Sequence, residues 1–168
     1  MSDNKHDILT VLQDVRDGNL TPEGALLRLK LSPFEDLGYA KVDYHRAVRQ
    51  GAAEVIFGQS KTTEQILGIL GSMERRECTN VLVTRINQET ADALSERFPL
   101  RYNALARLAG VFPKALEGRG SIVVATGGTS DMGVAEEAAI TAEALGNAVT
   151  RLYDVGVAGL HRLLANLE

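Results

Sequence analysis

The sequence predicts an α/β protein in which a helical hairpin and a small α/β region precede an incomplete parallel βαβ unit. Two observations predict this class. Short apolar runs, such as residues 80–84 and 121–126, alternate with amphipathic segments of helical length. Turn residues separate the runs, and residues 113–120 form the strongest candidate boundary. We therefore expect a hairpin over residues 1–30, an α/β region over 31–118 and a partial second α/β region over 119–168.

Two helices are expected at the N-terminus. Apolar residues recur at helical spacing over residues 7–17, and a Gly-Asn pair follows them. Thr21 and Pro22 then have the residue types of an N-cap and a first helical position. We expect the two helices to serve packing or oligomerisation.

The middle of the chain alternates between strand and helix patterns. The expected strands are residues 37–43, 54–58 and 80–84, and the expected helices are residues 44–50, a segment that begins near 62, and residues 88–97. Residues 101–111 fit a strand followed by a turn about as well as they fit a helix.

The last part of the chain has the pattern of a βαβ unit. We expect a strand at 121–126, a helix at 131–145, a strand at 148–154 and a final helix at 156–164. A crossover of this length joins parallel strands with right-handed topology. So few strands leave an apolar sheet edge uncovered, which predicts association into a homo-oligomer.

Composition narrows the range of partners. The net charge is -4, from 18 basic and 22 acidic residues, and aromatic residues make up only 5%. Neither value suits a general nucleic-acid binder, which needs a basic face and stacking platforms. No apolar run approaches the length of a membrane span. A single cysteine, Cys78, excludes an intrachain disulfide and favours the reducing cytoplasm.

The loop after the strand at 121–126 does not match either common phosphate motif. Gly128 and Gly133 have P-loop spacing, but Val134 stands where that motif requires a lysine. The dinucleotide fingerprint fails as well, because Gly127 and Gly128 are adjacent.

Residues 127–131 can nevertheless bind an anion. Gly127 and Gly128 allow positive φ and a close approach of backbone to ligand. Thr129 and Ser130 offer hydroxyl groups at a helix N-terminus, where phosphates bind readily. Ser130 or Asp131 could instead cap the helix, so capping alone explains the motif equally well.

A second loop should open on the same edge of the sheet. Asp154 ends the next expected strand, and His161 and Arg162 follow it. Ligands of open parallel sheets bind at the carboxyl edge, so a phosphate site with an acid/base group is a reasonable hypothesis. The alternative is that His161 and Arg162 only cap a terminal helix.

A basic cluster lies in the first half of the chain. Arg46 and Arg49 share one face of a helical turn, and Lys61 follows a Gly-Gln-Ser turn. These side chains suit a pyrophosphate or a substrate carboxylate. They could equally pair with Asp43 or Glu54 within the chain. We assign no metal ligands.

Several runs of residues resemble a known family, the carboxylases of nickel-pincer (lactate racemase) cofactor biosynthesis. The C-terminal part is also similar to aminoimidazole ribonucleotide carboxylase. The resemblance is carried by residues 43–46, 48–51, 54–62, 124–131, 134–139, 142–146 and 151–162. It spans nearly the whole chain and implies a flavodoxin-like, carboxylase-like fold for the βαβ unit.

The resemblance also implies a reaction. Family members carboxylate the pyridinium ring of nicotinic acid adenine dinucleotide with CO2 or bicarbonate and release AMP, which gives pyridinium-3,5-biscarboxylic acid mononucleotide. No cofactor is assigned with certainty, and Mg2+ stays an open option. The implied catalytic residues are His161 and Asp131, and the implied substrate-binding residues are Gly127, Gly128, Thr129, Ser130, Asp131, Arg162, Arg46, Arg49 and Lys61.

Two other functions stay open. One is a carboxylase or mutase of purine synthesis, and the other is a non-catalytic module for nucleotide binding or assembly. The family carries a catalytic cysteine in a further C-terminal segment, and Cys78 does not match it. We therefore expect a chain that is truncated at its C-terminus and impaired in turnover.

Overall fold

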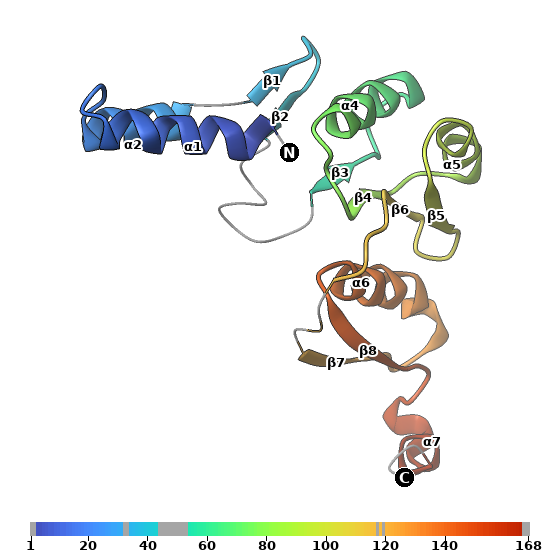
Figure 1. The fold of residues 1–168 in the computed structure, drawn as a ribbon. Coiled ribbons are helices and arrows are strands. Elements are labelled where there is room, and N and C mark those ends of the chain that lie inside the picture. The colour runs from blue at the N-terminus through green and yellow to red at the C-terminus, as the bar shows by residue number, and fades with distance from the viewer. Residues whose placement is uncertain (1–2, 32–33, 44–53, 117, 119, 166–168) are drawn as a thin grey trace. The chain divides into compact units, whose positions relative to one another are not determined.

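The computed structural model describes residues 3–31, 34–43, 54–116, 118 and 120–165 (Figure 1). It is a mixed α/β protein, as predicted. By compactness the chain divides into two units, residues 1–51 with 67–78 and residues 52–66 with 79–168. The expected domain boundaries near residues 30 and 118 stay predictions.

The first unit contains the predicted helical hairpin, α1 (Asp3–Arg16) and α2 (Pro22–Leu31). The N-cap prediction is confirmed, because the Thr21 hydroxyl oxygen accepts a hydrogen bond of 3.1 Å from the Gly24 N–H. Gly18 turns the chain between the helices with φ of 76°, a left-handed value that favours glycine. Val11 and Ala25 are the buried apolar side chains among those residues of the pair whose burial the structure describes.

The prediction of one strand over residues 37–43 is wrong. The structure has an antiparallel hairpin of β1 (Phe34–Asp36) and β2 (Lys41–Asp43). The Leu37 N–H donates to the Ala40 carbonyl at 2.9 Å, and Gly38 has φ of 80°. A tight turn of this kind needs a left-handed residue, which Gly38 supplies. The helix expected at 44–50 lies outside the described residues.

The second unit contains a four-stranded sheet in the order β3-β4-β6-β5. The parallel pair β3 (Val55–Phe57) and β4 (Val81–Thr84) is joined through α4 (Thr63–Arg75). All three elements were predicted. β4 is buried along its whole length, which explains its unbroken apolar sequence.

The ambiguous segment 101–111 proves to be a hairpin. β5 (Leu100–Asn103) and β6 (Leu108–Val111) pair in antiparallel register, and β6 also pairs with β4. The Asn103 carboxamide oxygen accepts from the Ala106 N–H at 2.9 Å and closes the turn. Before it lies the predicted helix α5 (Gln88–Ser95), which Asn87 caps.

The predicted parallel βαβ unit is confirmed. It consists of β7 (Gly120–Ala125), α6 (Met132–Ala144) and β8 (Asn147–Leu152). Gly146 ends α6 with φ of 89°. Ile140 and Ala144 of α6 pack against the buried cluster of Leu82, Ala106 and Leu108 in the four-stranded sheet.

The final helix is shorter than the predicted segment 156–164. A 3-10 turn, η2 (Val157–Gly159), comes first, and α7 (Leu160–Leu164) follows it. A second 3-10 turn, η1 (Thr129–Asp131), precedes α6.

Candidate functional site at the carboxyl edge of the βαβ unit

Thr126 joins the two loops that leave the carboxyl ends of β7 and β8. Its N–H donates to the Leu152 carbonyl at 3.1 Å, and its carbonyl accepts from the Val155 N–H at 2.9 Å. Its hydroxyl oxygen accepts from the Asp154 N–H at 3.0 Å. With 6% of its surface exposed, Thr126 is one of the few buried polar side chains. The predicted meeting of the two loops at one sheet edge is therefore confirmed.

The two loops also approach each other closely at glycines. A Cβ atom added to Gly156 would lie 2.3 Å from the Gly127 carbonyl oxygen, so only glycine fits there without movement. Gly128 faces open space, since an added Cβ would meet nothing within 4 Å. Neither Gly127 nor Gly128 uses the positive φ that glycine allows, and Gly128 is extended with φ of -151°. Extended backbone suffices because η1 turns the chain after it.

The alternative interpretation, in which Ser130 or Asp131 only caps the helix, finds no support in the structure. Asp131 occupies the N-cap position of α6 with φ of -93° and ψ of -4°, and its side chain makes no capping hydrogen bond. The 3-10 turn satisfies the backbone instead, because the Asp131 N–H faces the Gly128 carbonyl at 3.4 Å and the Met132 N–H donates to Thr129. The exposed side chains of Thr129, Ser130 and Asp131 are thus not used for capping.

Such an arrangement can bind an anion. The N-terminal end of α6 carries a partial positive charge, and hydroxyl groups donate hydrogen bonds to phosphate oxygens. A carboxylate in the same turn repels phosphate, so Asp131 suits a different task. It can accept hydrogen bonds from sugar hydroxyls or take up a proton.

Arg162 lies at the same edge through an ion pair with Asp154. Asp154 has φ of 58°, an uncommon left-handed conformation that aspartate tolerates better than most residues. Both side chains are partly exposed, at 39% and 40%. Of the two predicted arrangements, capping of the last helix and convergence on the loop, the contact with Asp154 fits convergence better.

The structure shows no hydrogen bond from the side chains of His161 and Lys61 to these loops. His161 is exposed on α7, and its side chain makes no hydrogen bond or ion pair with any residue that the structure describes. The ammonium group of Lys61 donates to the Phe57 carbonyl at 3.1 Å, within its own turn. Arg46 and Arg49 lie outside the described residues. Their role in binding the substrate stays a prediction.

A polar network that the sequence analysis missed fixes α6 against β8. Arg151 donates to Glu136 at 3.0 Å and to Glu143 at 2.6 Å and 3.1 Å, and the Tyr153 hydroxyl donates to Glu136 at 2.9 Å. The hydrogen bond to Glu143 contributes most to a pKa of Arg151 that is raised above its ordinary value. The pKa of Tyr153 is raised mainly by burial and then by Glu136.

The sequence carried a signal for this network in the spacing of its residues. Arg151 and Tyr153 are two apart in the predicted strand 148–154 and would share a face there, and Glu136 and Glu143 are two helical turns apart. The network holds the start of α6, and with it the loop, at a fixed position relative to β8.

The described residues contain neither a candidate metal site nor a candidate membrane-spanning helix. Over the part of the chain that the structure describes, no group of three or more His, Cys, Asp or Glu side chains could hold a metal ion. Within the same residues, none of the helices combines the length and apolar character needed to cross a bilayer.

Comparison with known proteins identifies the family of the chain. Residues 34–112 match the model of a LarB/PurE-like N-terminal domain. An uncharacterized protein of Methanocaldococcus jannaschii is 30% identical over 180 residues, an alignment that spans 100% of this chain and 68% of the relative. The similarity of the C-terminal part to aminoimidazole ribonucleotide carboxylase stays a prediction. The alignment with the relative and the matched N-terminal domain together show that the chain belongs to the carboxylase-like LarB family.

Proposed function

We propose that this protein binds nicotinic acid adenine dinucleotide at residues 127–131 and takes part in the carboxylation of its pyridinium ring. One observation carries the proposal. Thr129, Ser130 and Asp131 are exposed at the start of α6, unused for capping, beside the loop that holds Asp154, which pairs with Arg162 of α7. The family membership supports the reaction class.

In this proposal the loop receives the phosphate groups of the dinucleotide. The hydroxyls of Thr129 and Ser130 donate to phosphate oxygens, and the close contact of Gly127 with Gly156 keeps the loop in place. Arg162 of α7 adds positive charge through its contact with Asp154 in the neighbouring loop. Arg46, Arg49 and Lys61 are proposed to contact the remainder of the dinucleotide.

The reaction has two parts. A carbon–carbon bond forms between a ring carbon and CO2, or CO2 derived from bicarbonate, and the ring C–H proton leaves to a base. Water cleaves the phosphoanhydride, so that AMP is released with pyridinium-3,5-biscarboxylic acid mononucleotide. We propose Asp131 or His161 as the group that accepts a proton at this edge.

Three secondary expectations belong to the proposal. Mg2+ could assist by neutralising phosphate charge. A cytoplasmic location is inferred from the single cysteine. A homo-oligomer is supported by exposed apolar side chains on the βαβ unit, of which Val123 is 63% and Val134 69% exposed.

Calorimetric titration tests the binding step. Nicotinic acid adenine dinucleotide is titrated into the full chain, with AMP and aminoimidazole ribonucleotide as comparators. We expect binding that is selective for the dinucleotide and that Ser130→Ala weakens by roughly tenfold, because one hydrogen bond to a charged group is lost. Ser121→Ala, at the opposite end of β7, is the matched control and should bind as the wild type does.

Two outcomes would count against the proposal. Selective binding of aminoimidazole ribonucleotide would favour the purine-pathway reaction. Dinucleotide binding that Ser130→Ala leaves unchanged would move the site away from the loop. Incorporation of labelled bicarbonate into the dinucleotide then tests turnover separately from binding.

A further inference from the structure

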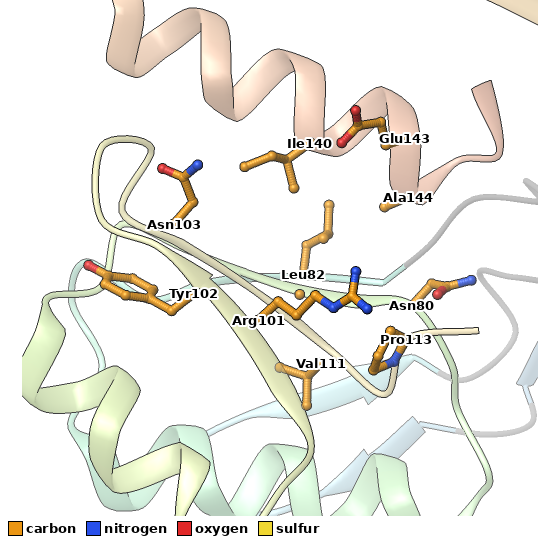
Figure 2. Close-up of a pocket in the computed structure, with 11 residues that line it drawn as sticks. Asn80, Leu82, Arg101, Tyr102, Asn103, Val111, Pro113, Ile140, Glu143 and Ala144 are labelled. Carbon is orange, nitrogen blue, oxygen red and sulfur yellow. The ribbon is translucent and has the colours of Figure 1, made fainter. Parts of the chain in front are cut away.

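A cavity of about 400 Å³ lies between the four-stranded sheet and α6. Figure 2 shows Leu82 and Arg101 on the sheet side and Ile140 and Glu143 on the helix side. Its volume falls in the range of pockets that hold small molecules. It shares no lining residue with the loop 126–131, so it is a separate candidate site.

Gly110 leaves the floor of this cavity open. Leu82 of β4 and Arg101 of β5 both pair with Gly110 of β6, so the three residues form one row across the sheet. A glycine inside an inner strand gives up packing and often marks a place where a ligand approaches the backbone. A Cβ atom at Gly110 would meet only Leu82, at 4.0 Å. The space above Gly110 is therefore not filled by neighbouring side chains.

Arg101 supplies an uncompensated positive charge. Its side chain makes no hydrogen bond or ion pair with any residue that the structure describes. Figure 2 shows the guanidinium group extending along the cavity toward the end formed by Asn80 and Pro113. The Asn80 carboxamide oxygen accepts from the Lys114 N–H at 2.8 Å, which leaves the amide N–H donors for another partner.

The other charged lining residue already has a partner. Glu143 forms an ion pair of 2.6 Å with Arg151, which also pairs with Glu136, so the negative charge of Glu143 is only partly offset. The rest of the lining is largely apolar and includes Val111, Ile140 and Ala144. The cavity thus combines the cation of Arg101, one carboxylate held by Arg151, one amide donor and an apolar wall.

We propose that this cavity binds a small organic carboxylate whose remaining surface is apolar. The carboxylate pairs with the fork of Arg101 and with the Asn80 amide, because guanidinium and carboxylate match in a bidentate geometry. The apolar body lies over Gly110 against Leu82 and Ile140. A free phosphate fits less well, since its higher charge would lose hydration against an apolar wall without further cations. This site goes beyond the proposed function and does not depend on it.

NMR titration of the uniformly 15N-labelled full chain tests the proposal, with sodium benzoate as the probe. Benzamide, which has the same ring without the charge, and inorganic phosphate are the comparators. We expect saturable shifts of the Arg101 and Gly110 amides with benzoate. Benzamide and phosphate should bind at least about tenfold more weakly, because each lacks one of the two matched features.

Two variants localise the response. Arg101→Gln removes the charge and should weaken benzoate binding by roughly tenfold or more, while Gly110→Leu fills the floor and should abolish it. Arg97→Gln is the matched control, because Arg97 lies over the Phe98 ring and outside the cavity. If Gly110→Leu fails to fold, Arg101→Gln still decides, since that side chain is exposed on an edge strand.

Each other result overturns the proposal. Benzoate shifts that are absent, or that persist unchanged in Arg101→Gln, mean that the cavity holds no carboxylate. Equal binding of benzamide removes the charge requirement, and equal binding of phosphate removes the apolar requirement. Loss of nucleotide binding in Ser130→Ala leaves this result unaffected, so the two proposals fail independently.

Discussion

Strands β4 and β7 have similar apolar sequences and opposite surroundings. In β4, Val81, Leu82 and Val83 are at most 2% exposed. In β7, Ile122 is 38% and Val123 is 63% exposed. Helix α6 packs against both strands, but β4 has a partner strand on each side, whereas β7 pairs with β8 alone among the strands that the structure describes. An apolar run therefore predicts a strand, but the number of neighbouring elements determines how far the side chains of that strand are buried.

We expect the largest effect on stability at Leu108 of β6, the strand that pairs with β4. Leu108 is fully buried in the cluster with Leu82 and Ala106. Leu108→Ala should lower the free energy of unfolding by about 2–5 kcal/mol, because it removes buried methyl groups and leaves a cavity. Val123→Ala, at the exposed strand, should change it by less than about 0.5 kcal/mol. Urea unfolding of both variants measures the difference. Equal losses would mean that β7 is covered as well as β6 is.

The next effect separates the two glycines of the site. Gly156→Ala places a Cβ atom 2.3 Å from the Gly127 carbonyl oxygen and must push the loops apart, at a cost of about 1–3 kcal/mol. Gly128→Ala meets nothing within 4 Å and should fold with nearly wild-type stability. Thermal unfolding of both compares them. A Gly156→Ala protein as stable as Gly128→Ala would contradict the close contact of the loops.

A smaller, pH-dependent effect is expected at Tyr153. Its raised pKa means that the folded protein favours the protonated phenol, which donates to Glu136. This contribution is fully present below the ordinary tyrosine pKa of about 10 and is lost as the pH rises through the raised value. Tyr153→Phe should therefore cost about 1 kcal/mol at neutral pH.

Urea unfolding of wild type and Tyr153→Phe on both sides of about pH 10 provides the check. The difference between the two proteins should shrink in the alkaline series. A constant difference would show that the hydroxyl does not act through its proton.

The smallest effect on stability is expected for Val123→Lys, a substitution that should instead weaken the association of the chain with other copies of itself. Val123→Lys places a charge on the exposed face of β7 and should leave the free energy of unfolding within about 0.5 kcal/mol. If this face is covered by another copy of the chain, sedimentation should show a smaller species than the wild type. An unchanged sedimentation coefficient would remove this face from the proposed oligomer contact.

The sequence was a good guide where strand and helix patterns were long and a poor one at turns. The parallel unit from β7 to β8 was predicted because an apolar run, a helix and a second run follow each other without interruption. Residues 101–111 stayed ambiguous because the turn after Asn103 is Ala-Leu-Ala-Arg, which favours a helix. The Asn103 side chain and the left-handed Arg107 impose the turn.

The site was predicted in part for similar reasons. The meeting of the 126–131 and 154–156 loops follows from the rule for parallel sheets, and Thr126 realises it through three hydrogen bonds. The role of Thr126 could not be predicted, because the sequence does not distinguish a buried threonine from an exposed one. The cavity beside Arg101 was missed because it joins residues from β5, β6 and α6 that are far apart along the chain.

The proposed nucleotide site at the start of α6 can be tested at single residues. We would titrate the 15N-labelled full chain with nicotinic acid adenine dinucleotide and follow the backbone amides. We expect saturable shifts concentrated at residues 127–132 and at 154–156, with those around Arg101 and Gly110 unaffected. Shifts confined to other parts of the chain, or no saturable shift at all, would contradict it.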